Sequence, residues 1–224
     1  NGYFKVKMDK CSSSVSKISS PSSLECHVGG FIGWIGRNGR SNLTIQNSQS
    51  NTYIDVTGNH NDVGGFIGCA SRNRLMNVTL DSIINRAQVI VNTKSNQANV
   101  GGIVGDVEEN PSMTMVLNNV TNTADLITTI SESSEDYEDE NNQECGCNSG
   151  GLVGRLDLVN DGTSFNFSVS NSVNNGNIDN ECPTSLSCGL FCVSAESFLH
   201  ERTVQVKNSI NNGTVKGNVS YGIA

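Results

Sequence analysis

The chain repeats one phrase, Asp62-Val63-Gly64-Gly65-Phe66-Ile67-Gly68, every few dozen residues. Clear copies begin at His27, Asn99 and Ser149, and weaker ones begin at Cys188 and Tyr221. A recurring period of this kind is typical of architectures in which each repeat is one structural unit. The segments between the glycine phrases then show what that unit is.

Alignment of the copies on their glycines places apolar residues in columns. Two columns lie two residues apart, which is the spacing of a strand with one buried face. The first of these columns holds Leu43, Val78, Met115, Phe167 and Val204. The second holds Ile45, Leu80, Leu117, Val169 and Val206. A third column follows nine residues later and holds Ile54, Val89, Leu126, Ile178 and Val215.

Each repeat therefore predicts three short strands: the glycine phrase, the segment ending at the second column, and the segment around the third. A single repeat cannot bury its apolar face, whereas stacked repeats share a continuous core. We expect an all-β fold, a parallel right-handed β-helix or β-solenoid with about one turn per repeat of 33–49 residues. The glycines would permit close backbone approach or tight corners.

A polar column lies between the apolar ones. Its members are Asn47, Ser82, Asn119, Asn171 and Asn208. Asparagines in one column are expected to stack as a ladder, each amide bonding to its copy one strand away, at a spacing of about 4.8 Å. Turn-forming residues follow, as in Asn174-Asn175-Gly176.

The chain divides into two parts on this interpretation. Residues 1–26 are expected to form an N-terminal strand and a Ser-rich disulfide loop. Residues 27–224 are expected to form about five repeats of a β-solenoid that continues beyond this fragment. The third repeat carries an insert at residues 131–148.

The repeat resembles a known family. The phrase at 150–154, together with the segment from Ser170 to Ile178, is similar to the GLUG repeat of bacterial and protist surface proteins. The Gly-Gly-apolar-apolar phrase is also similar to that of polymorphic outer-membrane adhesins. The resemblance covers roughly residues 27–224 and implies a β-helical, surface-displayed or secreted protein, often adhesive. It implies no catalytic residues, and Cys192 departs from it by replacing the last glycine of the fifth copy.

Charge and hydropathy exclude several partners. The net charge is -8, so there is no basic surface to displace the counterions of a nucleic acid. The same charge disfavours anionic lipid. No apolar run approaches the roughly 18 residues of a membrane-spanning helix, so we expect no membrane insertion in this segment.

Eight cysteines without a Cys-x-x-Cys pair favour disulfides over a zinc site, and hence an oxidising compartment. Short-loop closure favours Cys11 with Cys26. Cys145 and Cys147 precede the fourth glycine phrase, and Cys182 and Cys188 precede the fifth. One expectation is therefore a disulfide from Cys145 or Cys147 to Cys182 or Cys188. A bridge from Cys182 to Cys188 within their own loop is the other. We expect Cys69 and Cys192 to be unpaired with each other.

Seven acidic residues lie between Glu132 and Glu144, inside the insert. Like charges of this density indicate a solvated loop. Clustered carboxylates also suit calcium, although no calcium-binding motif is present. Six Asn-x-Ser/Thr sequons offer glycosylation sites at Asn42, Asn77, Asn119, Asn166, Asn212 and Asn218.

The expected function is that of a non-catalytic structural or adhesive β-helix, extracellular or on the cell surface. Its partners would be a host or neighbouring cell-surface protein or glycan, and it needs no cofactor and no metal. One alternative is a carbohydrate-active β-helix enzyme. That activity requires carboxylates that converge on one face, whereas Asp55 and Asp179 share a column three turns apart. A second alternative is a scaffold subunit of an extracellular filament that self-associates end to end.

Overall fold

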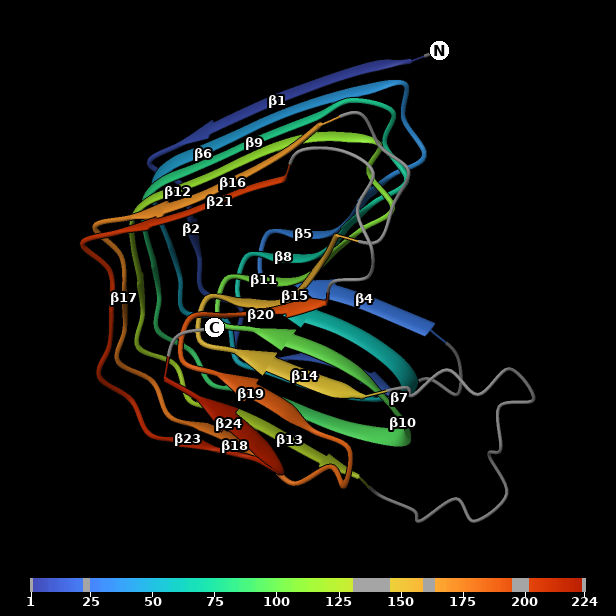
Figure 1. The fold of residues 1–224 in the computed structure, drawn as a ribbon, viewed down its shortest axis with the longest axis vertical. Coiled ribbons are helices and arrows are strands. Elements are labelled where there is room, and N and C mark those ends of the chain that lie inside the picture. Colours follow the sequence, from blue (N-terminus) through green and yellow to red (C-terminus); the bar gives the residue numbers. More distant parts are fainter. Residues whose placement is uncertain (1, 22–24, 131–145, 159–163, 195–201, 223–224) are drawn as a thin grey trace.

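A computed structural model describes residues 2–21, 25–130, 146–158, 164–194 and 202–222. All its regular structure is β, arranged as a parallel β-solenoid of about five turns built from three stacked sheets (Figure 1). This confirms the fold class that the glycine period predicts.

The three sheets run along the whole stack. Sheet A contains β1 (Tyr3–Asp9), β2 (Ser12–Ser13), β6 (Arg40–Ser50), β9 (Met76–Asn85), β12 (Ser112–Asn122), β16 (Ser164–Ser170), β17 (Val173–Asn174), β21 (Arg202–Lys207) and β22 (Ile210–Asn211). Sheet B contains β3 (Ile18–Pro21), β4 (Glu25–Gly29), β7 (Ile54–Gly64), β10 (Val89–Gly101), β13 (Leu126–Ile130), β14 (Cys147–Gly150), β18 (Ile178–Asn180), β19 (Leu186–Cys188), β23 (Val215–Lys216) and β24 (Val219–Tyr221). Sheet C contains β5 (Ile32–Gly36), β8 (Ile67–Ser71), β11 (Val104–Glu108), β15 (Val153–Asp157) and β20 (Phe191–Ser194).

Two apolar layers hold the sheets together. One lies between sheet A and sheet C and contains Leu80, Phe66 and Phe167. The other lies inside sheet B, because β7 and β10 curve so that their two halves face each other (Figure 1). Ile54 and Val63, from the two halves of β7, belong to this second core.

The predicted columns are confirmed by the strand register. Leu80 pairs with Ile45 on one side and with Leu117 on the other, and the row continues through Val169 to Val206. The first four members are buried, but Val206 is 41% exposed because no described strand covers β21. The expectation that the whole row is buried is therefore wrong at its last position. The third column is likewise in register from Ile54 to Val215.

The predicted asparagine column has a different role from the one expected. Asn47, Ser82, Asn119, Asn171 and Asn208 have φ between 50° and 55°, a left-handed conformation that Asn tolerates better than most residues. Only some of these side chains bond to the next copy, such as Asn208 to Asn171 at 3.3 Å.

A continuous, mainly buried ladder lies at the next corner instead. It runs through Asn85, Asn122, Asn174 and Asn211, with amide-to-carbonyl distances of 2.8–3.0 Å. A Cβ on Gly102 would lie 2.4 Å from the Asn122 side chain and 2.3 Å from the Gly151 carbonyl oxygen. The second glycine of the phrase therefore leaves room for the ladder and for the next turn.

Residues 1–26 are not a separate unit in the described structure. β1 and β2 pair with β6, and β3 and β4 pair with β7, so they form a further turn in the common register. The Ser-rich stretch, expected as a loop, contributes the short strands β2 and β3. Of the insert at 131–148, residues 131–145 lie outside the described residues.

Candidate functional site

The glycine corner brings the residues on its two sides face to face. The chain leaves sheet B at Gly64, turns, and enters sheet C at Ile67. Side chains just before the phrase therefore meet side chains just after it, between the two sheets. The sheet B column is His27, Asp62, Asn99 and Asn148. The sheet C column is Trp34, Cys69, Asp106 and Arg155.

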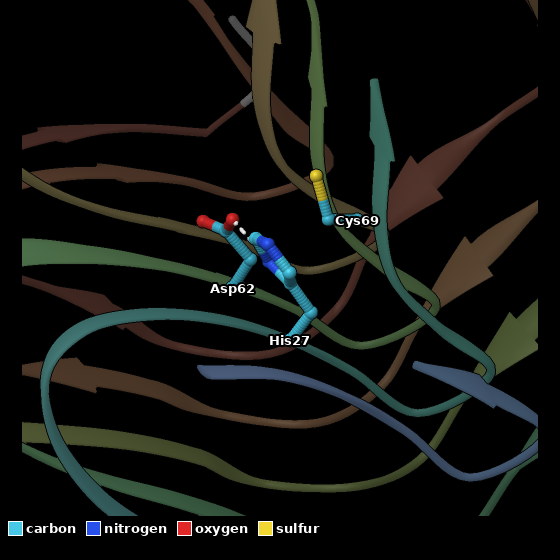
Figure 2. Close-up of side chains that lie close together, drawn as sticks. All are labelled: His27, Asp62 and Cys69. Carbon is cyan, nitrogen blue, oxygen red and sulfur yellow. Dashed lines mark ion pairs between the residues drawn. The ribbon is translucent and has the colours of Figure 1, made fainter. Parts of the chain in front are cut away.

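These two columns together form a polar layer between sheets B and C. Asp62 is the central residue at the end of the layer that also contains His27. His27 Nδ1 lies 2.9 Å from Asp62 Oδ2 (Figure 2). His60 Nε2 lies 3.4 Å from Asp62 Oδ1. Asn99 donates its side-chain amide to Oδ1 at 2.9 Å. Burial would raise the pKa of Asp62, but the two histidines and Asn99 outweigh it and hold the pKa well below its usual range.

The pKa values of the two histidines are shifted in the opposite direction, upward. Burial disfavours the charged imidazoles, yet the Asp62 carboxylate outweighs burial and raises the pKa of both His27 and His60 above the ordinary value. His27 also stacks on Trp34, with ring centroids 5.6 Å apart.

At the other end of the polar layer, Arg155 forms ion pairs with two carboxylates. Its Nε and Nη2 donate to the two Asp106 oxygens at 2.9 and 2.7 Å, and Nη2 also lies 2.5 Å from Glu108 Oε2. Asp106 is fully buried. Burial and then the charge of Asp62 raise the pKa of Asp106, although Arg155 acts in the opposite direction.

Cys69 lies between the two ends and is fully buried. Its sulfur is within 4.8 Å of ligand atoms of His27 and Asp62, and also of Asp106 and Glu108. Burial, and then the charges of Asp62 and Asp106, raise the pKa of the Cys69 thiol far above its usual value. A thiol that is protonated and fully buried is a poor nucleophile.

The outward carboxylates considered for catalysis do not converge in the described structure. Asp55 and Asp179 are in one register column, three turns apart. Lys17 binds Asp55 at 2.8 Å and Lys216 binds Asp179 at 2.9 Å. Both carboxylates are thus held in ion pairs at the surface.

The cysteines are free thiols in the described residues, and Cys145 lies outside them. Cys11 bonds to the Asp9 carbonyl and Cys26 contacts Ser20, so the expected Cys11–Cys26 bridge is not present. Cys182 raises the pKa of the neighbouring Cys147 thiol, and Cys147 lowers the pKa of Cys182. Burial, and then Cys188, raise the pKa of Cys192.

The six sequon asparagines are all at least partly exposed. Asn42, Asn77 and Asn166 form one outward column on sheet A. Asn119, Asn212 and Asn218 are exposed at corners or on the last turn. A glycan on any of them would point away from the core.

The sequence analysis did not predict the polar layer, because it aligned the glycines and the apolar columns and not the residues that flank the glycine phrase. A signal was present: His27 and Asp62 are each two residues before the first glycine of their phrase, and Cys69 and Asp106 each follow the last one. Aligning the flanks as well as the glycines would have placed these residues in two columns.

Comparison with known proteins adds no identification. No family model matches the chain, no curated protein matches it, and no solved structure matches it. Within the described residues there is no helix of sufficient length and apolar character to cross a bilayer.

Proposed function

We propose that this chain is a non-catalytic structural and adhesive module of an extracellular or cell-surface protein, as its resemblance to GLUG-repeat proteins implies. The observation that carries the proposal is the outward face of sheet A. From β6 to β21 its central column is polar and uncharged, with Asn42, Asn77, Thr114, Asn166 and Thr203, and in β1 the same column holds Lys5. A regular array of amides and hydroxyls suits hydrogen bonding to a glycan or a protein surface.

The distribution of reactive groups supports a binding role. Among the described residues, the titratable groups around Asp62 and Asp106 cluster closely and are buried between sheets B and C. Glycoside cleavage needs two carboxyl groups about 5–9.5 Å apart around a bound sugar. Asp55 and Asp179, the outward pair, are three turns apart and bound to lysines.

Extracellular display is supported by the accessible sequons. All six sequon asparagines have surface to which a glycan attaches without disturbing a core residue. The contact between Cys147 and Cys182 supplies a place for one disulfide in an oxidising compartment.

A bead-binding assay tests the adhesive role. Beads coated with the folded chain are applied to a printed glycan panel, and we expect selective retention on particular glycans. Replacing Asn77 and Thr114 by lysine should abolish retention, whereas Ile90→Lys and Ile127→Lys, on the outward side of sheet B, should preserve it. Retention equal to that of albumin-coated beads, or cleavage of the glycans, contradicts the proposal.

A specific observation favours a second candidate, a scaffold that stacks end to end. The last turn exposes Val204, Val206 and Tyr221, and β1 exposes Tyr3 and Phe4 at the opposite edge of sheet A. The register columns extend through both edges (Figure 1). A second copy added in register would place its Val6 and Met8 against Val204 and Val206, and its Asp9 against Lys207.

Such a contact joins two different surfaces, so it generates open filaments rather than closed dimers. Sedimentation velocity over a concentration series should show masses that increase beyond the dimer. Val206→Lys should keep the chain monomeric, and Thr203→Lys, on the outward face of the same strand, should not. A monomer at every concentration excludes this candidate.

A further inference from the structure

The side chains of His27, Asp62 and Cys69 come from three different strands, β4, β7 and β8. One ligand atom from each lies within 4.8 Å of the other two (Figure 2). Asp62 and Cys69 are fully buried, and the His27 side chain is 19% exposed. The cluster therefore has one side through which a small ion can enter.

Two buried atoms in this cluster lack a hydrogen bond. His27 Nδ1 and Asp62 Oδ2 lie 2.9 Å apart as an ion pair, and neither atom makes a hydrogen bond within the described structure. A buried polar group without a partner is costly. The Cys69 sulfur lies within 4.8 Å of a ligand atom of each of these two residues.

We propose that this cluster binds a divalent transition-metal ion, Zn²⁺ in the first place, through His27 Nδ1, Asp62 Oδ2 and Cys69 Sγ. Imidazole, carboxylate and thiolate are the ligand types of protein zinc sites, with bonds of about 2.0–2.3 Å. The thiolate and the imidazole favour a transition metal over Ca²⁺ or Mg²⁺, which prefer oxygen ligands. Binding forms the metal–sulfur bond as the Cys69 S–H bond breaks, and the proton is released to solvent.

The surrounding contacts orient these three atoms. His27 Nε2 lies 3.2 Å from Glu25 Oε1, so Nε2 can carry the proton and leave the Nδ1 lone pair for the metal. Asn99 already bonds to Asp62 Oδ1, which leaves Oδ2 for the metal. A water from the exposed side would complete four-coordination.

Charge favours this side of Cys69 over the other. Asp106 and Glu108 also come within 4.8 Å of the Cys69 sulfur, but both already form ion pairs with Arg155. A cation bound there would meet a guanidinium at close range. The metal would thus lie on the histidine side, within the same polar layer. The inference goes beyond the proposed adhesive role and does not depend on it.

Cobalt titration tests the site, because Co²⁺ adopts zinc geometry and gives a thiolate charge-transfer band in the near ultraviolet. The reduced, chelator-treated chain should bind one Co²⁺ with that band, and Zn²⁺ should displace it. Cys69→Ser should lose the band. Cys182→Ser and Cys188→Ser, which alter other buried thiols, should keep it.

Variants of Glu25 and His27, whose side chains are partly exposed, keep the test decisive if Cys69→Ser fails to fold. Glu25→Gln should bind Co²⁺ about 10-fold more weakly, and His27→Gln more weakly still. Zn²⁺ should raise the melting temperature of the wild-type chain more than that of His27→Gln. Absence of a thiolate band in the folded wild-type chain overturns the inference. So does a band that persists in Cys69→Ser, or an affinity unchanged in both Glu25→Gln and His27→Gln.

Discussion

Asn122 donates its side-chain amide to Oδ1 of Asn174 at 2.8 Å, although 52 residues separate the two along the chain. The bond joins the turn before the acidic insert to the turn after it. Asn122 also donates to the Ala124 carbonyl at 2.9 Å and accepts from Asn85 at 3.0 Å. One buried amide thus fixes its own corner and connects three turns.

Asn122→Ala should lower the free energy of unfolding by about 3 kcal/mol, because it leaves buried partners in a connected network without bonds. Chemical denaturation followed by circular dichroism measures the loss. Asn77→Ala, on the outward face of sheet A, should change stability by less than about 0.5 kcal/mol. Equal effects of the two changes would show that the ladder contributes little.

Leu80 and Val206 allow a comparison within one column. Leu80→Asp should cost several kcal/mol and prevent cooperative folding, because it places an unpaired charge in the core between sheets A and C. Val206→Asp, in the same column but 41% exposed, should cost less than about 1 kcal/mol. Thermal melts of the monomeric chain at low concentration distinguish the two. A Leu80→Asp chain as stable as Val206→Asp would contradict the observed burial.

The fold was predictable because the columns repeat the same residue class at the same place. Leu, Ile, Val, Met and Phe recur two residues apart, and the glycine phrase marks each corner. The buried ladder was not recognised, because Asn174 and Asn211 precede glycines and resemble ordinary turn formers. Which of two asparagine columns is buried depends on the direction of the corner, and that appears only once the sheets are placed.

The polar layer was harder to predict for a different reason. One column carries His, Asp and two Asn, and the other carries Trp, Cys, Asp and Arg, so neither column keeps one residue type throughout. Asp62 and Cys69 are seven positions apart, a separation that matches no metal or catalytic motif. Their proximity results from the glycine corner together with the parallel register, and neither is visible at a single position.

Arg155 gives a pH-dependent prediction for the chelator-treated chain. Arg155→Gln should cost about 3–5 kcal/mol near neutral pH, because it leaves the buried Asp106 carboxyl without its cation. Arg72→Gln breaks a surface pair with Glu109 and should cost at most about 1 kcal/mol.

The sign of the pH effect follows from the carboxyl groups. Burial raises the pKa of Asp106 and Glu108 above the unfolded values, although Arg155 opposes the shift. Without Arg155 their pKa values rise further, so the folded variant binds more protons than the unfolded chain. Its stability then falls as pH rises from about 4 through the raised values. The deficit of Arg155→Gln should be smaller at pH 5 than at pH 8, and a deficit that grows on acidification would contradict this assignment.

The last prediction concerns the contact between Cys147 and Cys182. The neighbouring Cys147 lowers the pKa of Cys182, which favours thiolate attack during disulfide exchange. Incubation with oxidised glutathione, which accepts the two electrons, should give a Cys147–Cys182 link in unreduced peptide maps. The link ties the strand after the insert to the next turn, so it should raise the melting temperature. Cys182→Ser should abolish the link and the stabilisation, whereas Cys11→Ser should preserve both. A Cys182–Cys188 or Cys69–Cys192 link would contradict the prediction, and the latter would also contradict the order in which the turns stack.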